Sequence, residues 1–205
     1  MMALKAERRS QAERRDEAEH RLLAAAVRLV AERGLDRFTL ADVGEAAGYS
    51  RGLPAHYFGS KSGLIVALAI HLVESFGRAL DRTEHHARGM ERLLGTTAFY
   101  FDSSRENPMG TRALFVLLGD GLSNGLIRDQ LAALNARSAK AFEVNILAAV
   151  EAGEARADID AKAMGILVLA GLRGAVGQWL LAPEAIDLAA VRDEFVGALR
   201  RSLEP

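Results

Sequence analysis

The side chains best suited to chemistry gather in one short segment, "AAGYSRGLPAHYFGSK", which spans residues 46–61. The segment places Ser, Arg, His, Tyr and Lys among Gly and Pro residues, between two apolar stretches. A simple loop requires only turn-forming residues. Arginine pairs with guanine in the major groove of DNA, and Ser, Tyr and Lys side chains bind phosphate. The segment therefore indicates a surface that binds nucleic acid.

Each polar residue of this segment has an expected role. We expect Arg51 to contact a guanine and Gly52 to let the backbone approach the bases. Ser50 is expected to reach a phosphate or to cap a helix. The residues expected to bind phosphate are His56, Tyr57 and Lys61. Taken singly, each is also common on an ordinary surface or in a core, so the prediction depends on their order along the chain.

Other chemistry has little support in the sequence. The chain has no cysteine, which excludes disulfides, thiolate zinc sites and cysteine nucleophiles. His85 and His86 are adjacent and cannot share one helix face, so no metal site is expected. No Gly-x-Ser-x-Gly, P-loop or Gly-x-Gly-x-x-Gly motif is found, and we expect neither an enzyme nor a cofactor.

Charge and hydropathy bound the class of protein. The 26 basic and 27 acidic residues nearly balance, which excludes a bulk polycation that coats nucleic acid. The first 20 residues lack the apolar centre of a signal peptide, so a cytoplasmic protein without a membrane segment is expected. The run "AMGILVLAGLRGAVGQWLLA", interrupted by Arg173 and Gln178, is interpreted as a buried helix.

Helix signals dominate the sequence, and the predicted fold class is all-α. A first helix is expected to begin at Ser10, within the capping pattern "SQAE", and to end at Gly34. A short second helix, capped by Thr39, would stop at Gly48, and Ser50 would cap a third. Two short helices joined by so tight a turn have the geometry of a helix-turn-helix motif.

The remaining residues predict a larger helical body. A fourth helix should start near residues 60–62, and Pro108 should open another after an intervening helix from about residue 90. A long helix is expected over residues 127–152, followed by the polar linker "GEARADID" and two final helices separated by Pro183. We expect a helix-turn-helix domain over residues 1–60 and a helical ligand-binding and dimerisation domain over residues 61–205.

Residues 38–64, "FTLADVGEAAGYSRGLPAHYFGSKSGL", resemble the DNA-binding domain of the TetR family of bacterial transcriptional regulators. That motif runs from a Thr-capped helix through Gly-x-Ser to His-Tyr-Phe and Ser-Lys. The resemblance implies that phosphates are bound by Thr39, Tyr57 and Lys61. It implies that the groove of double-stranded DNA is faced by Ser50, Arg51 and Gly52.

Two positions depart from the family pattern. Pro54 and Ala55 stand where members commonly have Leu-Tyr before His-Tyr-Phe, so a frequent tyrosine contact to DNA is absent. Ala55 could instead touch a thymine methyl group. Ala41 is too short for the polar contact that some members make at the start of the second helix. Both departures bear on which operator sequence is bound.

A single helix-turn-helix contacts few base pairs, so a homodimer on a palindrome is expected. The last two helices carry stripes suited to an interface; these are Leu167, Gly171, Gly174 and Gln178, and then Phe195, Leu199 and Leu203. In the resembled family, the corresponding helices form a four-helix bundle with their symmetry mates. The same stripes could instead complete the core of one protomer.

The resemblance also implies a small-molecule effector bound among the helices of the larger domain, and hence a repressor released from its operator by that effector. Residues that could line such a cavity are His71, Phe76, Phe99, Tyr100, Phe115, Asn145, Gln178 and Trp179. Asn145 would need a polar partner if its helix face is buried. Two alternatives stay open: an all-α ligand-binding or adaptor protein without DNA-binding activity, and a small enzyme.

Overall fold

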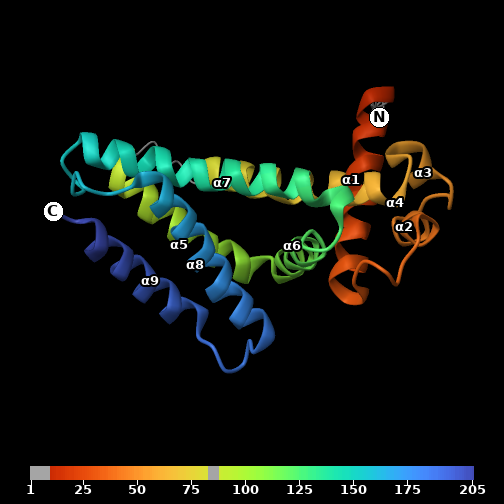
Figure 1. The fold of residues 1–205 in the computed structure, drawn as a ribbon. Helices are drawn as coiled ribbons and strands as arrows, with labels where there is room; N and C mark the ends of the chain where they lie inside the picture. Colours follow the sequence, from red (N-terminus) through yellow and green to blue (C-terminus); the bar gives the residue numbers. More distant parts are fainter. Residues whose placement is uncertain (1–9, 83–87) are drawn as a thin grey trace, which may run out of the picture.

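The computed structural model describes residues 10–82 and 88–205, and these residues form nine helices and no strand. The all-α prediction is therefore confirmed. The helices are α1 Gln11–Arg33, α2 Leu40–Ala46, α3 Leu53–Phe58, α4 Lys61–Asp81, α5 Gly89–Glu106, α6 Pro108–Asp120, α7 Gly125–Glu151, α8 Ala161–Leu181 and α9 Leu188–Leu203. Helices α2 and α3 lie at one end of the elongated molecule, and α8 and α9 lie toward the other (Figure 1).

Local capping fixes where the first helices begin. Ser10 and Glu13 form a capping box at the start of α1, as the sequence predicts, and Gly34 ends that helix with a φ of 75°. Thr39 and Asp42 form a second capping box at the start of α2. The predicted cap at Ser50 is wrong, because α3 begins two residues later, with Gly52 at its N-cap and no side-chain cap.

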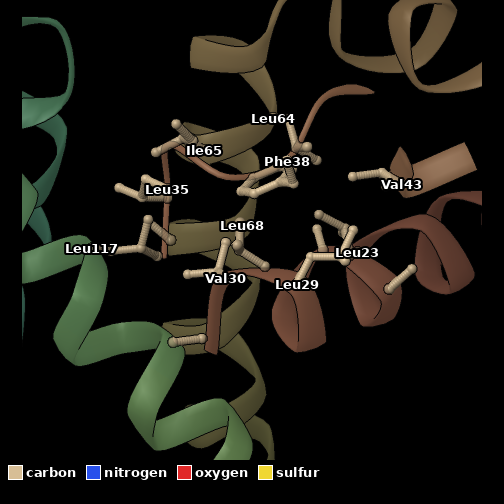
Figure 2. Packing of buried hydrophobic residues seen from close by; sticks show 14 of the residues in the cluster. Leu23, Leu29, Val30, Leu35, Phe38, Val43, Leu64, Ile65, Leu68 and Leu117 are labelled. Atoms are coloured by element: carbon tan, nitrogen blue, oxygen red, sulfur yellow. The ribbon is translucent and has the colours of Figure 1, made fainter. Parts of the chain in front are cut away.

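A first hydrophobic core joins the N-terminal helices to the larger body. Leu23, Leu29 and Val30 of α1 pack with Leu64 and Leu68 of α4 (Figure 2). Leu117 of α6 lies in the same core, as do buried residues from the first half of α7. Helix α4 begins the larger body by sequence, yet it supplies part of the core on which α1, α2 and α3 rest. A change in the packing of α4 would therefore alter the packing of the helix-turn-helix motif as well.

A second hydrophobic core lies among α5, α7, α8 and α9. Val168, Leu172 and Val176 place one face of α8 in this core, whereas Leu167 and Leu181 on the same helix are 62% and 82% exposed. The prediction of a buried helix therefore holds for one face only. By length and composition α4 and α8 could each cross a membrane, but both contribute buried residues to the cores of this fold.

The two stripes expected at a dimer interface have different surroundings. On α9, Leu199 and Leu203 are buried in the core of the protomer, so the interface prediction is wrong for them. Phe195 packs across α8, where a Cβ on Gly171 would lie 2.7 Å from its ring. The outer face of α8, by contrast, remains open at Leu167 and Gly174. Helix α9 thus completes the protomer, and α8 offers the uncovered surface.

Candidate DNA interface and ligand cavity

A close contact between α2 and the following turn holds the helix-turn-helix motif together. Gly44 of α2 is buried against this turn, and a Cβ at position 44 would clash with the Ser50 carbonyl oxygen and lie 3.2 Å from the Arg51 Cα atom. Pro54 is buried at the start of α3, where its missing N–H is tolerated. The close approach at Gly44 fixes the angle at which α3 leaves the turn, and the sequence analysis did not single out this glycine.

The residues predicted to face DNA lie together on the outside of this motif. The exposed ones are Ser50, Arg51, Gly52, Ala55 and His56, and they surround the first turn of α3. Tyr57 is half-buried. The surface has the features that a major-groove reader requires, namely small residues and one long hydrogen-bonding side chain with no bulky apolar group among them.

Arg51 has an acidic neighbour that sequence reasoning missed. Its Nη1 atom lies 3.0 Å from Oε1 of Glu45, and both side chains are more than half exposed. An exposed pair of this kind contributes about 0–1 kcal/mol to stability. A guanine or a phosphate can therefore displace Glu45 at small energetic cost.

Thr39 caps α2 rather than pointing free to solvent. Its hydroxyl accepts from the Asp42 N–H at 3.2 Å and donates to the Asp42 carboxylate at 2.9 Å. The Thr39 backbone N–H also donates to that carboxylate, at 2.7 Å. These hydrogen bonds, that of the backbone N–H first, lower the pKa of Asp42 below its usual value. The ionised Asp42 carboxylate lies in the first turn of α2, where its negative charge interacts favourably with the positive end of the helix dipole.

Tyr57 and Lys61 already have partners within the protein. The Tyr57 hydroxyl donates to the Arg15 carbonyl at 3.3 Å. The Lys61 Nζ atom donates to the Phe38 carbonyl at 2.7 Å and lies 4.6 Å from the centre of the Phe38 ring. An ammonium group has three N–H donors, so Lys61 can bind a phosphate and keep its contact to Phe38. Tyr57 has a single O–H, so it can donate to a phosphate only after its hydrogen bond to the Arg15 carbonyl breaks.

Two arginines of α1 hold the far end of α2. Arg21 donates from Nη2 to the Ala47 carbonyl at 3.1 Å, and Arg28 donates from Nη2 to the Ala46 carbonyl at 3.2 Å. The last carbonyls of a helix lack partners within the helix, and cations stabilise that end. Nothing in the sequence could have indicated these contacts, because they depend on how α1 crosses α2.

A cavity of about 1200 Å³ lies between this motif and the larger body. Its wall includes Arg21 and Arg28 of α1, Ala46 and Ala47 at the end of α2, and residues of α4, α5, α6, α7 and α8. Several lining residues, among them Met109 and Arg137, are exposed, whereas others, among them Tyr100 and Phe142, are buried. The cavity therefore opens to solvent and reaches into the second core.

The cavity contains part of the set expected to bind an effector. Four members of the expected set are among the residues that line the cavity, namely His71, Phe76, Phe99 and Tyr100. The rings of Phe76 and Phe99 are 5.3 Å apart, and those of Phe76 and Tyr100 are 5.6 Å apart. Burial lowers the pKa of His71, and the nearby His20 and Arg78 lower it further.

The residues of that set outside this cavity are Phe115, Asn145, Gln178 and Trp179. Asn145 donates to the Ala141 carbonyl of its own helix at 2.8 Å, so it needs no partner from another helix. Phe115 packs toward Gly177 of α8. Periodicity could not separate these residues from the cavity wall, because core and cavity positions share the same helix faces.

Within residues 10–82 and 88–205, no group of three or more His, Asp or Glu side chains is arranged to hold a metal ion. His85 and His86, considered above, lie outside these residues. The arrangement therefore offers two features for function, an exposed helix-turn-helix surface and a large cavity behind it.

The helix-turn-helix segment is similar to known DNA-binding regulators. The family model described as "Bacterial regulatory proteins, tetR family" matches residues 22–68. The HTH-type transcriptional regulator BetI of Brucella suis is 35% identical over 85 residues, which are 41% of this chain and 43% of that protein. The chain thus spans less than half the length of this relative. The HTH-type transcriptional regulator ArpR of Pseudomonas putida is 26% identical over 185 residues, 85% of this chain and 86% of that protein.

Solved structures share the whole fold. A TetR-family transcriptional regulator from Rhodococcus sp. superposes with a TM-score of 0.81 at 23% identity, over 90% of this chain and 97% of that one. A transcriptional regulator from Saccharomonospora viridis, solved in complex with choline, gives a TM-score of 0.81 at 19% identity, over 93% and 99% of the two chains. The family match falls on the residues that build the helix-turn-helix motif and its core, so residues 22–68 are similar to the DNA-binding domain of the tetR family of bacterial regulatory proteins.

Proposed function

We propose that this protein is a homodimeric, cytoplasmic transcriptional regulator that binds a palindromic double-stranded DNA operator and is a repressor released by a small-molecule effector. The observation that carries the proposal is the surface around α3, where Ser50, Arg51 and Gly52 are exposed in front of a turn fixed by Gly44. Protein side chains presented in this way can enter a major groove without moving the core.

The proposed division of labour follows from the chemistry of each side chain. Arg51 reads a base, because its planar guanidinium matches the two acceptors of guanine. Lys61 and Tyr57 bind phosphates, with Lys61 at the first position of α4, where free backbone N–H groups attract anions. Thr39, at the N-cap of α2, and His56 add further phosphate contacts.

The proposed dimer interface is the outer face of α8. Leu167, Gly174 and Leu181 follow one another at helical spacing and are exposed, as is Gln178 between the last two. Glycine permits close approach of a second helix, and exposed leucines gain free energy when they are covered. Two motifs held at a fixed distance can then read half-sites separated by roughly 34–36 Å or a multiple of it.

The proposed effector site is the cavity, and its position supports a link to DNA binding. Arg21 and Arg28 line it while they hold the end of α2, so a molecule in the cavity can contact both arginines. An effector releases DNA only if it binds the conformation that does not fit DNA more tightly than the one that does. A ligand that competes for these arginines would change the orientation of α2.

The reading and anchoring roles can be tested with two substitutions. Arg51→Ala should cost about 1–3 kcal/mol in discrimination at one base position, because the guanine contact is lost. Lys61→Ala should weaken binding to all DNA sequences and reduce the salt dependence by about one unit per protomer. Both variants would be titrated with operator and with random duplex at several salt concentrations.

Equal losses on operator and random DNA for both variants would contradict these roles. Absence of sequence-selective binding at every salt concentration would instead favour the adaptor alternative, in which the same surface contacts a protein.

A further inference from the structure

The cavity wall contains a cation that no described residue neutralises. Arg173 of α8 donates from Nη1 to Oδ1 of Asn135 on α7 at 2.8 Å. Its Nε atom is buried and has no hydrogen-bond partner among the described residues. The Asn135 amide carries no charge, and no carboxylate of the described chain forms an ion pair with Arg173. Arg173 is half-buried, and its buried Nε–H is left unsatisfied.

A second unsatisfied donor lies beside the first. Tyr100 of α5 is only 9% exposed, and its hydroxyl is buried without a hydrogen-bond partner in the described residues. Burial raises the pKa of Tyr100, and the charge of Arg173 and a weak hydrogen bond from its guanidinium to the phenol oxygen partly oppose that rise. Arg173 and Tyr100 are therefore neighbours, and the Tyr100 O–H still lacks an acceptor. The phenol therefore stays protonated at neutral pH and can donate. Two helices thus bring a cationic donor and a neutral donor to the same part of the cavity wall.

The rest of the wall mixes apolar side chains with hydroxyl and amide groups, and basic side chains outnumber acidic ones among its described residues. Among the described residues, four arginines line the cavity, Arg21, Arg28, Arg137 and Arg173, and Glu106 is the one acidic residue. Phe76 and Phe99 lie next to Tyr100. Ser103 and Ser104 also line the cavity, but their hydroxyls donate to the Tyr100 carbonyl. Aromatic rings alone would suit a quaternary ammonium ion. Beside the unneutralised Arg173, however, a cation would be repelled.

We propose that the cavity binds an amphipathic carboxylate, with its anionic end at Arg173 and Tyr100 and its apolar body against Phe76 and Phe99. A carboxylate accepts hydrogen bonds only, so it can take the Arg173 Nε–H and the Tyr100 O–H and also supplies the missing negative charge. Asn135 is a positioning residue, because it holds Arg173 through Nη1. This inference rests on the proposed function in one respect: it takes the cavity to be the effector site.

Three ligands of equal chain length test the charge preference. Decanoate, decanol and decyltrimethylammonium would be titrated into the purified protein by calorimetry, each below the concentration at which it aggregates. We expect decanoate to bind at least about tenfold more tightly than decanol, because charge-assisted hydrogen bonds are the stronger ones. Decyltrimethylammonium should bind more weakly than decanol.

Substitutions then place the anionic end. Arg173→Gln should weaken decanoate binding by about tenfold or more and leave decanol within about threefold, and Tyr100→Phe should weaken decanoate by a smaller factor. Arg173→Lys keeps the charge and should restore part of the affinity, which separates charge recognition from a general packing defect. Arg200→Gln removes an exposed guanidinium on α9 and is the matched control.

The outcomes separate this inference from the proposed function. Decanol or decyltrimethylammonium binding as tightly as decanoate, or full decanoate affinity in both Arg173→Gln and Tyr100→Phe, would overturn it. Failure of all three ligands to bind a protein that still selects an operator would also overturn it, while DNA reading would stand. Decanoate binding that requires Arg173 but leaves operator affinity unchanged would support the carboxylate site and contradict release by an effector there.

Discussion

Arg51 and Lys61 both have partners in the protein without DNA, and the two partnerships differ in what DNA must displace. The Glu45 carboxylate at Arg51 is exposed, so under the proposed function a guanine or phosphate would replace it with little loss. The Phe38 carbonyl at Lys61 occupies one N–H of three, so that contact can persist in a complex. Both contacts also hold long side chains in place beforehand, which reduces the entropy lost when DNA binds.

The close packing at Gly44 leads to a prediction about stability. Gly44→Ala should lower the free energy of unfolding by about 1–3 kcal/mol, because the new Cβ meets the Ser50 carbonyl in a packed turn. Operator affinity should fall as well, since α3 shifts with the turn. Urea unfolding followed by circular dichroism measures the first effect.

Gly52→Ala is the matched control for this substitution. Position 52 has nothing within 4 Å of a Cβ and a φ of −85°, so its effect on stability should be much smaller. Equal stability losses at the two positions would show that the close approach at Gly44 is unimportant.

At the scale of the helix, local signals predicted boundaries well, whereas contacts between helices were beyond the sequence. The capping boxes at Ser10 and Thr39 are local, so the sequence predicts them correctly. The ion pair of Glu45 with Arg51 and the contacts of Arg21 to the end of α2 arise only when separate elements meet. Periodicity placed Leu199 on an apolar stripe but could not tell that its own protomer buries that stripe.

The exposed face of α8 leads to a prediction about dimer formation. Leu167→Arg should raise the dissociation constant of the dimer by more than about tenfold, because an unpaired charge would be buried in an apolar interface. Leu167 is 62% exposed, so the protomer should fold normally. Sedimentation equilibrium gives the oligomeric state, and Leu122→Arg, at a leucine that is 82% exposed and lies between α6 and α7, is the control. An unchanged dimer would show that α8 is not the interface.

In the whole molecule, the cavity is lined by helices that also contribute to the two hydrophobic cores. The first core ties α4 to the helix-turn-helix motif, and the second ties α8 to α5 and α9. The cavity lies between them and touches helices of both. A ligand that alters the packing of α4 against α1 would therefore act on α2 and α3 through direct contacts.

The proposed function depends above all on the reading of a palindromic DNA sequence by this protein. We would select bound fragments from a pool of random duplexes with the full chain at about 150 mM salt, where nonspecific phosphate contacts are weakened. We expect recovery of a palindrome whose half-sites are roughly 34–36 Å apart, or a multiple of that distance. Recovery of no preferred sequence by ligand-free protein would contradict it.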